Sequence, residues 1–221
     1  MEKISYEKTI EYLKDRFKFD DNQALPINLD IDRFRGLTSI WRELGFKVGA
    51  EIGVNNGRYS KWMAIKVKNP KLFLIDPYKE YAEYVESHIN GQEVFDQYYE
   101  NAKERLRKFN VEFIRKTSME AINDFTDNSL DFVFIDGNHT FEYVVNDIAE
   151  WEKKLKPGGI LSGHDYWRSI ESNKSAYVQN HTYEDRLKLV QVKDAVDGWT
   201  KANRVKPWFV TKDRCWFYVK K

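Results

Sequence analysis

Residues 48–57 read Val48-Gly49-Ala50-Glu51-Ile52-Gly53-Val54-Asn55-Asn56-Gly57, a short apolar run that leads into a turn containing glycines. The run predicts a buried strand, and residues 58–67 resume the apolar spacing of a helix directly after the turn. A strand, a tight turn and a helix in this order are typical of the repeating unit of a parallel sheet whose faces are covered by helices.

The same alternation continues to the end of the chain. Apolar runs predict strands at 72–77, 111–114, 130–137, 160–163, 207–211 and 215–219. Helices are predicted at 92–109, 119–125, 140–155 and 191–202, and Pro157-Gly158-Gly159 predicts a sharp turn. Because only residues 212–214 separate the last two strands, these should pair as an antiparallel hairpin. We expect an α/β, Rossmann-like fold with a seven-stranded, mostly parallel sheet, this C-terminal hairpin, and helices on both faces.

The first 45 residues depart from this alternation. Two amphipathic helices are predicted at 4–18 and 32–45, with a break between them that contains Pro26. We therefore divide the chain into an N-terminal helical extension or cap, residues 1–45, and one domain, residues 46–221. Residues 168–190 have the weakest pattern and are predicted to form a mobile loop over the site.

Composition narrows the class of protein. The chain has 221 residues, 42% of them hydrophobic, which is enough for one globular core. Its 36 basic and 35 acidic residues nearly cancel, so no global field attracts nucleic acid or an anionic membrane. The sequence has no apolar stretch of membrane-spanning length, and Cys215, the single cysteine, is expected to be a buried core residue. We expect a cytoplasmic protein without nucleic-acid or membrane partners.

The turn after the first predicted strand of the domain has the features of a nucleoside site. Gly53 allows a tight turn, Gly57 lets the chain approach a ligand, and Glu51 precedes both. The G-x-G-x-x-G pattern of dinucleotide sites is missing, and an acid here suits a ligand with a positive centre. Asp76, at the end of the next strand, can accept hydrogen bonds from ribose hydroxyls. The competing interpretation is a pair of turn glycines and a helix-capping aspartate.

Polar residues also follow two later strands. Asp136 and His139 end the strand at 130–137, and His164 and Asp165 follow the strand at 160–163. Neighbouring strands lie about 4.8 Å apart, so these side chains should converge. Two carboxylates placed together need a proton or a cation between them, and oxygen ligands with imidazole suit Mg²⁺ or Mn²⁺. We predict a metal site of Asp136, His164 and Asp165, with His139 as the base for a metal-bound hydroxyl. A capping aspartate and unrelated histidines are the competing interpretation.

The chain resembles the class I methyltransferases that use S-adenosylmethionine (SAM), and within them the small-molecule O-methyltransferases of methyltransferase family 24. The resemblance covers residues 48–221 and is most specific at 127–139, 155–159 and 163–166. It implies that SAM is the cofactor, with its methionine part at the glycine turn, its ribose at the strand-end acid and its adenine beside residues 117–119. The expected cofactor-binding residues are Glu51, Gly53, Val54, Asn55, Gly57, Asp76, Pro77, Thr117, Ser118, Met119 and Asp136.

The resemblance extends to the catalytic end. Relatives of the catechol and caffeoyl type hold a divalent metal on an Asp after strand four and on an Asp-Asn pair after strand five. Asp136 matches the first ligand, His164 and Asp165 stand where the pair would be, and His139 stands where those relatives carry a catalytic Lys. The resemblance implies methyl transfer to a hydroxyl of a small molecule, glycan or natural product, with Asp136 and His139 as catalytic residues.

Several alternatives stay open at the level of sequence. Tyr166, Trp167 and Tyr177 would stack on an acceptor, or instead form a loop seat or the contact of a homodimer. A metal-dependent phosphoesterase shares the Gly-Asn-His and Gly-His patterns, but it requires an early Asp-x-His, which the sequence lacks before residue 139. An NAD-linked oxidoreductase is disfavoured by the missing G-x-G-x-x-G. A non-catalytic module that binds SAM or takes part in an assembly is the third alternative.

Overall fold

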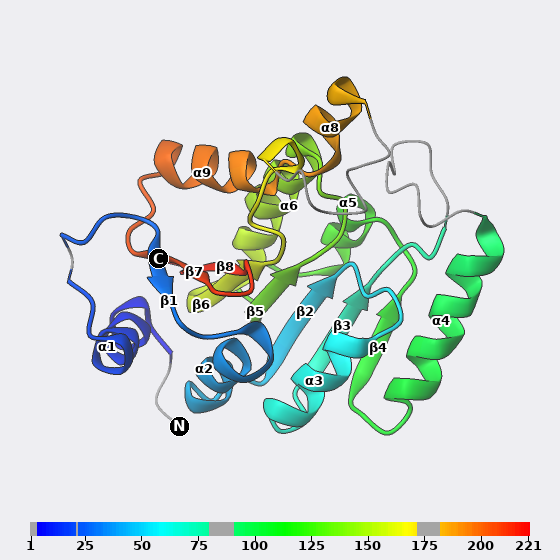
Figure 1. Ribbon diagram of the computed structural model, residues 1–221. Helices are drawn as coiled ribbons and strands as arrows, with labels where there is room; N and C mark the ends of the chain where they lie inside the picture. The colour runs from blue at the N-terminus through cyan, green and yellow to red at the C-terminus, as the bar shows by residue number, and fades with distance from the viewer. Residues whose placement is uncertain (1–3, 21, 80–90, 172–181) are drawn as a thin grey trace.

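The computed structural model describes residues 4–20, 22–79, 91–171 and 182–221. In these residues the chain forms one eight-stranded sheet in the order β1-β7-β8-β6-β5-β2-β3-β4 (Figure 1). The strands are β1 (Ile27–Leu29), β2 (Val48–Ile52), β3 (Lys71–Ile75), β4 (Val111–Ile114), β5 (Leu130–Ile135), β6 (Leu155–Gly163), β7 (Trp208–Thr211) and β8 (Trp216–Val219). β8 runs antiparallel to both β6 and β7, and the other neighbours are parallel. The predicted fold class is confirmed, and β1 is an additional strand.

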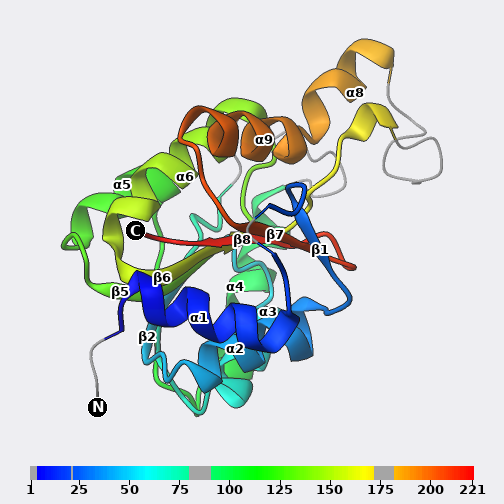
Figure 2. The same ribbon diagram turned by 90° about the vertical axis from the view of Figure 1, so that its left-hand side faces the viewer.

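Helices cover both faces of this sheet. They are α1 (Tyr6–Phe17), α2 (Thr38–Glu43), α3 (Arg58–Lys66), α4 (Gln92–Leu106), α5 (Ser118–Ala121), α6 (Phe141–Lys154), α8 (Tyr183–Leu189) and α9 (Val192–Ala202). Helices α1 to α4 pack on one face, and α5, α6 and α9 pack on the other (Figure 2). Successive strand residues point to opposite faces, so Phe132 and Phe134 of β5 belong to the first core, and Val133 and Ile135 belong to the second.

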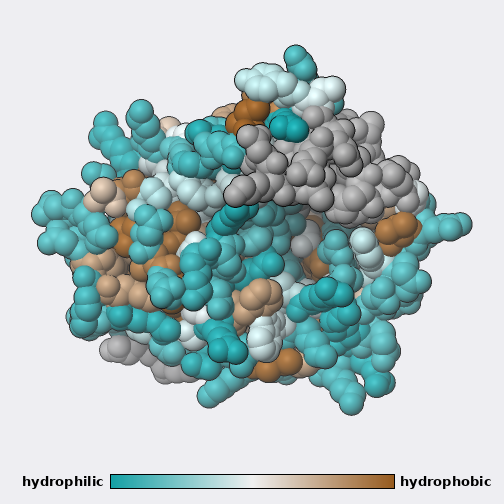
Figure 3. All heavy atoms as spheres, in the orientation of Figure 1, coloured by the Kyte–Doolittle hydropathy of each residue, from teal (hydrophilic) through white to brown (hydrophobic). Residues whose placement is uncertain are grey.

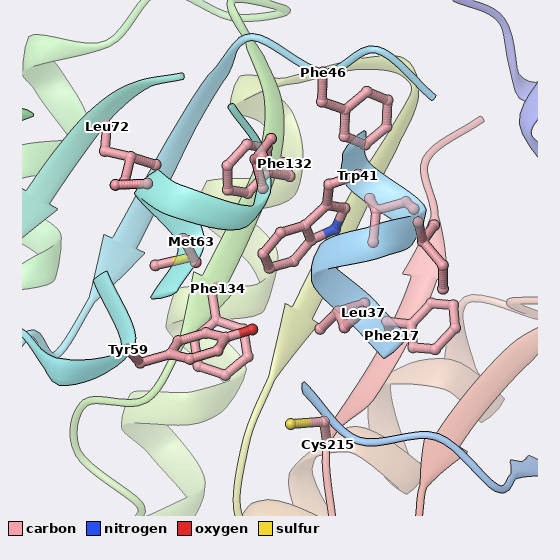
Figure 4. Packing of buried hydrophobic residues seen from close by; sticks show 14 of the residues in the cluster. Leu37, Trp41, Phe46, Tyr59, Met63, Leu72, Phe132, Phe134, Cys215 and Phe217 are labelled. Atoms are coloured by element: carbon pink, nitrogen blue, oxygen red, sulfur yellow. The ribbon is translucent and has the colours of Figure 1, made fainter. Parts of the chain in front are cut away.

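Aromatic side chains of β5 hold α2 and α3 against the sheet (Figure 4). Trp41 of α2 stacks on Phe132, with ring centroids 4.3 Å apart and planes at 17°. Gly49 of β2 lies directly against the same ring, so that a Cβ on this residue would come within 2.3 Å of the ring. Tyr59 of α3 packs on Phe134 with ring centroids 4.4 Å apart. This packing fixes both helices against β2 and β5, two neighbouring inner strands of the sheet.

Strand β6 is longer than the sequence indicates. Pro157, Gly158 and Gly159 lie within it, so the prediction of a sharp turn is wrong. The register against β5 shifts at this point, and Gly158 has a φ of 85°. Helix α1 packs on the irregular strand, and the Thr9 hydroxyl of α1 donates a hydrogen bond of 2.8 Å to the Gly158 carbonyl. The turn residues therefore make room for α1 instead of reversing the chain.

The N-terminal segment takes part in the sheet. β1 pairs in parallel with β7, with Ile27 opposite Phe209. A π-helical turn, Arg33–Leu37, then leads into α2, and Asp32 caps it by accepting a hydrogen bond from the Arg35 backbone N–H at 2.7 Å. A strand of three residues is too short to show alternation, which explains why the sequence did not predict it. The division of the chain after residue 45 stays a prediction.

The face of the molecule seen in Figure 3 shows little contiguous apolar area among the described residues. Hydrophilic residues dominate the face seen in Figure 3, and hydrophobic residues form small separate patches on it. Among the residues of the described ranges, the exposed large hydrophobic side chains are Ile65, Phe141, Tyr143, Tyr183 and Leu187. Among the residues that the structure describes, no helix has both the length and the apolar character needed to cross a membrane.

Replacing Gly49 with Ala should destabilise the fold. The added methyl group would meet the Phe132 ring in a packed core, and such overpacking costs on the order of 1–3 kcal/mol of the free energy of unfolding. Urea unfolding should therefore show a lower midpoint than in the wild type. Gly198→Ala in α9 is the control, because a Cβ there meets nothing within 4 Å, and this variant should unfold no earlier than the wild type. Equal midpoints for Gly49→Ala and the wild type would contradict the packing described.

Candidate functional site

A cavity of about 840 Å³ lies at the carboxyl ends of β2, β3 and β5. Ligands of open α/β sheets bind at this edge, and the volume falls in the usual range for small-molecule sites. The cavity walls come from the turn after β2, the segment after β3, helix α5, the loop after β5 and the first turns of α6. The lining residues that were also predicted to bind the cofactor are Glu51, Gly53, Val54, Asn55, Asp76, Pro77, Thr117, Ser118, Met119 and Asp136.

Gly57 is the predicted cofactor residue that does not line this cavity. It precedes α3 with a φ of 71°, and a Cβ on it would lie 3.0 Å from Leu106 and 3.1 Å from Ala102 of α4. The structure thus gives Gly57 a packing role between two helices. Its role in cofactor binding stays a prediction.

Gly53 brings the ends of β2 and β5 together. It has a φ of 84°, and a Cβ on it would lie 2.1 Å from the carbonyl oxygen of Asp136. The Asp136 backbone N–H also donates a 2.7 Å hydrogen bond to the carbonyl of Ile52. Only glycine combines this backbone conformation with this closeness, so the turn and the Asp136 loop form one continuous wall.

Glu51 lies at the end of β2 and is only 2% exposed. Its side chain points toward α3 and accepts a hydrogen bond from the Ser60 hydroxyl. Burial raises the pKa of Glu51 to about 8, the Ser60 hydrogen bond opposes this, and the charge of Asp136 adds to it. A cationic ligand group beside Glu51 would therefore favour its ionised form.

Asp76 braces the glycine turn from β3. Its Oδ2 accepts hydrogen bonds from the backbone N–H groups of Val54 and Asn55 at 3.0 and 2.9 Å, and its Oδ1 accepts one from Tyr78 at 2.9 Å. Burial raises the pKa of Asp76, and these backbone donors oppose the rise. Because a carboxylate offers about four lone-pair sites, Asp76 retains capacity for a ligand hydroxyl in addition to its structural role.

Four predicted side chains converge beyond β5 and β6. His139 Nε2 lies 3.5 Å from Asp136 Oδ1 and 3.3 Å from Asp165 Oδ2, while His164 Nδ1 lies 3.2 Å from Asp165 Oδ1. The ligand atoms of Asp136, His139 and Asp165 are all within 4.8 Å of one another. β5 and β6 are neighbours in parallel register, with Ile135 opposite Gly163, which is why the two loops meet.

Hydrogen bonds orient His164 and Asp165. His164 Nε2 is 2.9 Å from the carbonyl oxygen of Asp213, which can only accept, so Nε2 carries the hydrogen and Nδ1 faces the cluster. Burial lowers the pKa of His164, but the hydrogen bond to Asp165 and the charge of Asp136 outweigh it and leave the pKa raised. For Asp165 the effects have the opposite sign. Burial raises the pKa of its carboxyl group, but the hydrogen bond from His164 and the charges of the two histidines hold this pKa well below its usual range.

Arg33 and Asp213 are site residues that the sequence did not reveal. Arg33 Nη1 lies 3.4 Å from Asp136 Oδ2, and the Arg33 backbone N–H donates a 3.1 Å hydrogen bond to Asp213 Oδ2. The guanidinium carbon is 5.0 Å and 5.3 Å from the ring centroids of Phe34 and Tyr59. No local pattern signals these contacts, because they join the N-terminal segment to loops more than a hundred residues away.

The aromatic residues after β6 have defined partners. The Trp167 indole N–H donates a 3.1 Å hydrogen bond to Asp165 Oδ1, so it helps to orient the cluster. The Tyr166 hydroxyl donates to Asp197 at 2.5 Å, and its ring packs edge-on against Trp208. Tyr166 therefore seats the loop on α9 and β7. Tyr177, the third predicted acceptor contact, lies outside the described residues.

A family model described as a methyltransferase domain, that of methyltransferase family 24, matches residues 50–166. The chain belongs to this methyltransferase family. Family membership and the α/β fold of the sheet agree with each other, and the phosphoesterase and oxidoreductase alternatives lose their basis. Two curated relatives have no described function. Protein R132 of Acanthamoeba polyphaga mimivirus is 32% identical over 125 residues, and protein y4gI of Sinorhizobium fredii is 31% identical over 75 residues. The matched parts make up 50% and 8% of those proteins, and 52% and 34% of this chain.

Solved structures share the fold. An O-methyltransferase from Bacillus cereus in complex with S-adenosylhomocysteine (SAH) is 14% identical, with a TM-score of 0.56 over 97% of this chain and 90% of that one. TomG, an O-methyltransferase of tomaymycin synthesis from Streptomyces achromogenes in complex with SAM, is 15% identical, with a TM-score of 0.57 over 100% and 92%. At such low identity these likenesses establish the architecture.

Replacing Gly53 with Ala should destabilise the protein far more than the same replacement at a glycine with a similar φ. Gly91 has a φ of 86°, nearly that of Gly53, but a Cβ on it meets nothing within 4 Å. Gly91→Ala should cost about 1–3 kcal/mol from its unfavourable backbone conformation alone. Gly53→Ala must also separate β2 from the Asp136 loop, so it should unfold at a clearly lower temperature in calorimetry. Equal melting temperatures for the two variants would contradict the close approach of these strands.

Replacing Glu51 with Gln should stabilise the ligand-free protein most at alkaline pH. The folded-state pKa is about 8 and an ordinary glutamate titrates near 4.3, so proton binding favours the folded state. That contribution is complete below about pH 4 and is lost as the pH rises through about 8. The gain in unfolding free energy should therefore exceed about 1 kcal/mol at pH 8.5 and nearly vanish at pH 4.5. Glu93→Gln, at an exposed position, is the control. A gain that does not depend on pH would refute the raised pKa.

Proposed function

We propose that this chain transfers the methyl group of SAM to a hydroxyl of a small-molecule acceptor, of the sugar or natural-product class, with the help of a divalent cation. The observation that carries the proposal is the convergence of Asp136, His139, His164 and Asp165 beside the cavity. Family membership and the likeness to O-methyltransferases with bound SAM or SAH support it. The cavity offers groups suited to a nucleoside, and the cluster offers acid–base groups.

The cavity has a group suited to each part of SAM. Glu51 is a buried acid that a ligand cation would stabilise in its ionised form, which fits the ammonium or sulfonium centre. Asp76 can accept hydrogen bonds from ribose hydroxyls while it braces the turn. Gly53 keeps the wall between Glu51 and Asp136 free of side-chain atoms. When bound, SAM supplies an electrophilic methyl group.

The donor set next to the cavity suits Mg²⁺ or Mn²⁺. Asp136 directs Oδ2 toward Arg33 and Oδ1 toward the two histidines. His164 presents Nδ1 while its other ring nitrogen donates to a backbone carbonyl, the arrangement typical of metal-binding histidines. Asp136, His164 and Asp165 would hold the cation, and a cation bound there lowers the pKa of an acceptor hydroxyl.

We infer that His139 removes the acceptor proton. It lines the cavity, and its Nε2 faces Asp136 Oδ1 and Asp165 Oδ2 at 3.5 and 3.3 Å. Two carboxylates at this distance stabilise the imidazolium that forms, as a general base requires. The same residues would position an acceptor oxygen near the methyl group of bound SAM, and such positioning contributes to the rate.

Calorimetric titration with SAH, in Mg²⁺ and again in EDTA, is the direct test. We expect micromolar affinity for SAH, and a separate titration with Mg²⁺ should give heat of metal binding that EDTA abolishes. Asp136→Asn should bind SAH nearly as well as the wild type but bind Mn²⁺ at least roughly tenfold more weakly in paramagnetic resonance titrations. Its rate of methyl transfer from labelled SAM to a panel of hydroxyl acceptors should fall by a factor on the order of 100 or more.

The control is Asp15→Asn, because the Asp15 side chain of α1 is 81% exposed and lies outside the cavity lining. Wild-type transfer rates in Asp136→Asn would refute the metal mechanism. SAH binding without transfer to any acceptor would favour a non-catalytic SAM-binding module. A wild-type protein that does not bind SAH would contradict the proposed function as a whole.

A further inference from the structure

Arg33 is a cation at the edge of the candidate site that the proposed mechanism does not use. It belongs to the π-helical turn of the N-terminal segment, and its side chain is 20% exposed. Its Nη1 lies 3.4 Å from Asp136 Oδ2, and its guanidinium carbon lies 5.3 Å from the ring centroid of Tyr59. Because Asp136 and Tyr59 both line the cavity, the guanidinium is held next to it.

Among the described residues, most of the guanidinium donors of Arg33 have no acceptor. One N–H of Nη1 makes the 3.4 Å hydrogen bond to Asp136. The buried Nε has no hydrogen-bond partner, since Asp213 Oδ2 is 4.0 Å away from it, and Nη2 has no acceptor within the described ranges either. A largely buried cation with unsatisfied donors gains free energy from a ligand that supplies acceptors.

Aromatic rings and backbone hydrogen bonds fix the position of Arg33. The guanidinium carbon lies 5.0 Å from the ring centroid of Phe34, in addition to its contact with Tyr59. The Arg33 backbone N–H donates to Asp213 Oδ2, and its carbonyl accepts a 3.3 Å hydrogen bond from the Tyr59 hydroxyl. A planar guanidinium held in this way is suited to bind a carboxylate through two parallel hydrogen bonds.

Arg33 and His139 face different oxygens of one carboxylate. Asp136 Oδ2 faces Arg33, and Asp136 Oδ1 lies 3.5 Å from His139 Nε2. Because His139 is the proposed base for the acceptor hydroxyl, a ligand group bound to Arg33 would lie close to that hydroxyl. The arrangement therefore suits an acceptor that has an anionic group beside the hydroxyl.

We propose that Arg33 binds a carboxylate of the acceptor, so that the acceptor is a hydroxy acid with its hydroxyl next to the carboxylate, as in a 2-hydroxy acid or a sugar acid. This inference rests on the proposed function, because it names the acceptor of the same site. The carboxylate accepts hydrogen bonds from the guanidinium, and the adjacent hydroxyl lies on the His139 side of Asp136. A neutral acceptor leaves the donors of Arg33 unsatisfied, which is how enclosed polar sites reject analogues.

The test compares glycolate with glycolamide, which share a hydroxyl and differ in the charge of the neighbouring group. Binding is measured by paramagnetic relaxation of the methylene protons of each probe, with protein saturated with Mn²⁺ and SAH. Because Mn²⁺ itself prefers a carboxylate, the ratio of the two dissociation constants is compared between the wild type and Arg33→Met. We expect the preference for glycolate to fall roughly tenfold or more in this variant, as the loss of a charged hydrogen-bonded pair implies.

Arg35→Met is the matched control, because Arg35 belongs to the same turn, is exposed and does not line the cavity. It should keep the wild-type preference. If Arg33→Met does not fold, Arg33→Lys replaces it and should show a reduced preference, because Lys keeps the charge but loses the paired hydrogen bonds. An unchanged preference in the Arg33 variant, or a wild type that does not bind glycolate, would overturn this inference alone. A wild type that does not bind SAH or Mn²⁺ would overturn the proposed function with it.

Discussion

The candidate site depends on how closely β2 and β5 approach each other at their carboxyl ends. The Asp136 backbone N–H donates to the Ile52 carbonyl, and the Gly53 N–H donates to the Ile75 carbonyl, so three strand ends are joined at one point. A side chain on Gly53 would collide with the Asp136 carbonyl. Because that side chain is missing, the glycine turn and the Asp136 loop share one wall. Groups suited to a nucleoside and groups suited to proton transfer therefore face the same space.

The site concentrates buried and half-buried acids, and the structure compensates them in different ways. Backbone N–H groups satisfy Asp76, which ties the glycine turn to β3. Imidazoles, together with an arginine from the N-terminal segment, surround Asp136 and Asp165. Glu51 and Asp147 have a hydroxyl donor each and a raised pKa, because burial is the largest influence on both. Glu51 and Asp147 gain most from a ligand that brings a cation or a hydrogen-bond donor. A ligand should therefore order this end of the cavity.

The N-terminal segment is joined to the site by more than packing. β1 extends the sheet beside β7, and Lys212 of the following hairpin turn donates its backbone N–H to the Ile31 carbonyl. Asp213 of the same turn binds the Arg33 backbone and also holds His164 through its own carbonyl. The edge strand, the hairpin turn and the cluster therefore form one connected unit. Changes in residues 27–33 should reach His164 through this turn.

The sequence by itself determined the alternating α/β fold, the strand-end positions of Asp76, Asp136 and Asp165, and the glycine turn, since apolar periodicity and turn residues are local signals. Only the tertiary structure decided that Gly57 packs against α4, that residues 157–159 continue a strand, and that Arg33 meets Asp136. It also placed Asp147 in the cavity wall. These outcomes depend on contacts between segments far apart in the chain, and no local pattern of residues encodes which helix, loop or carboxylate will lie opposite.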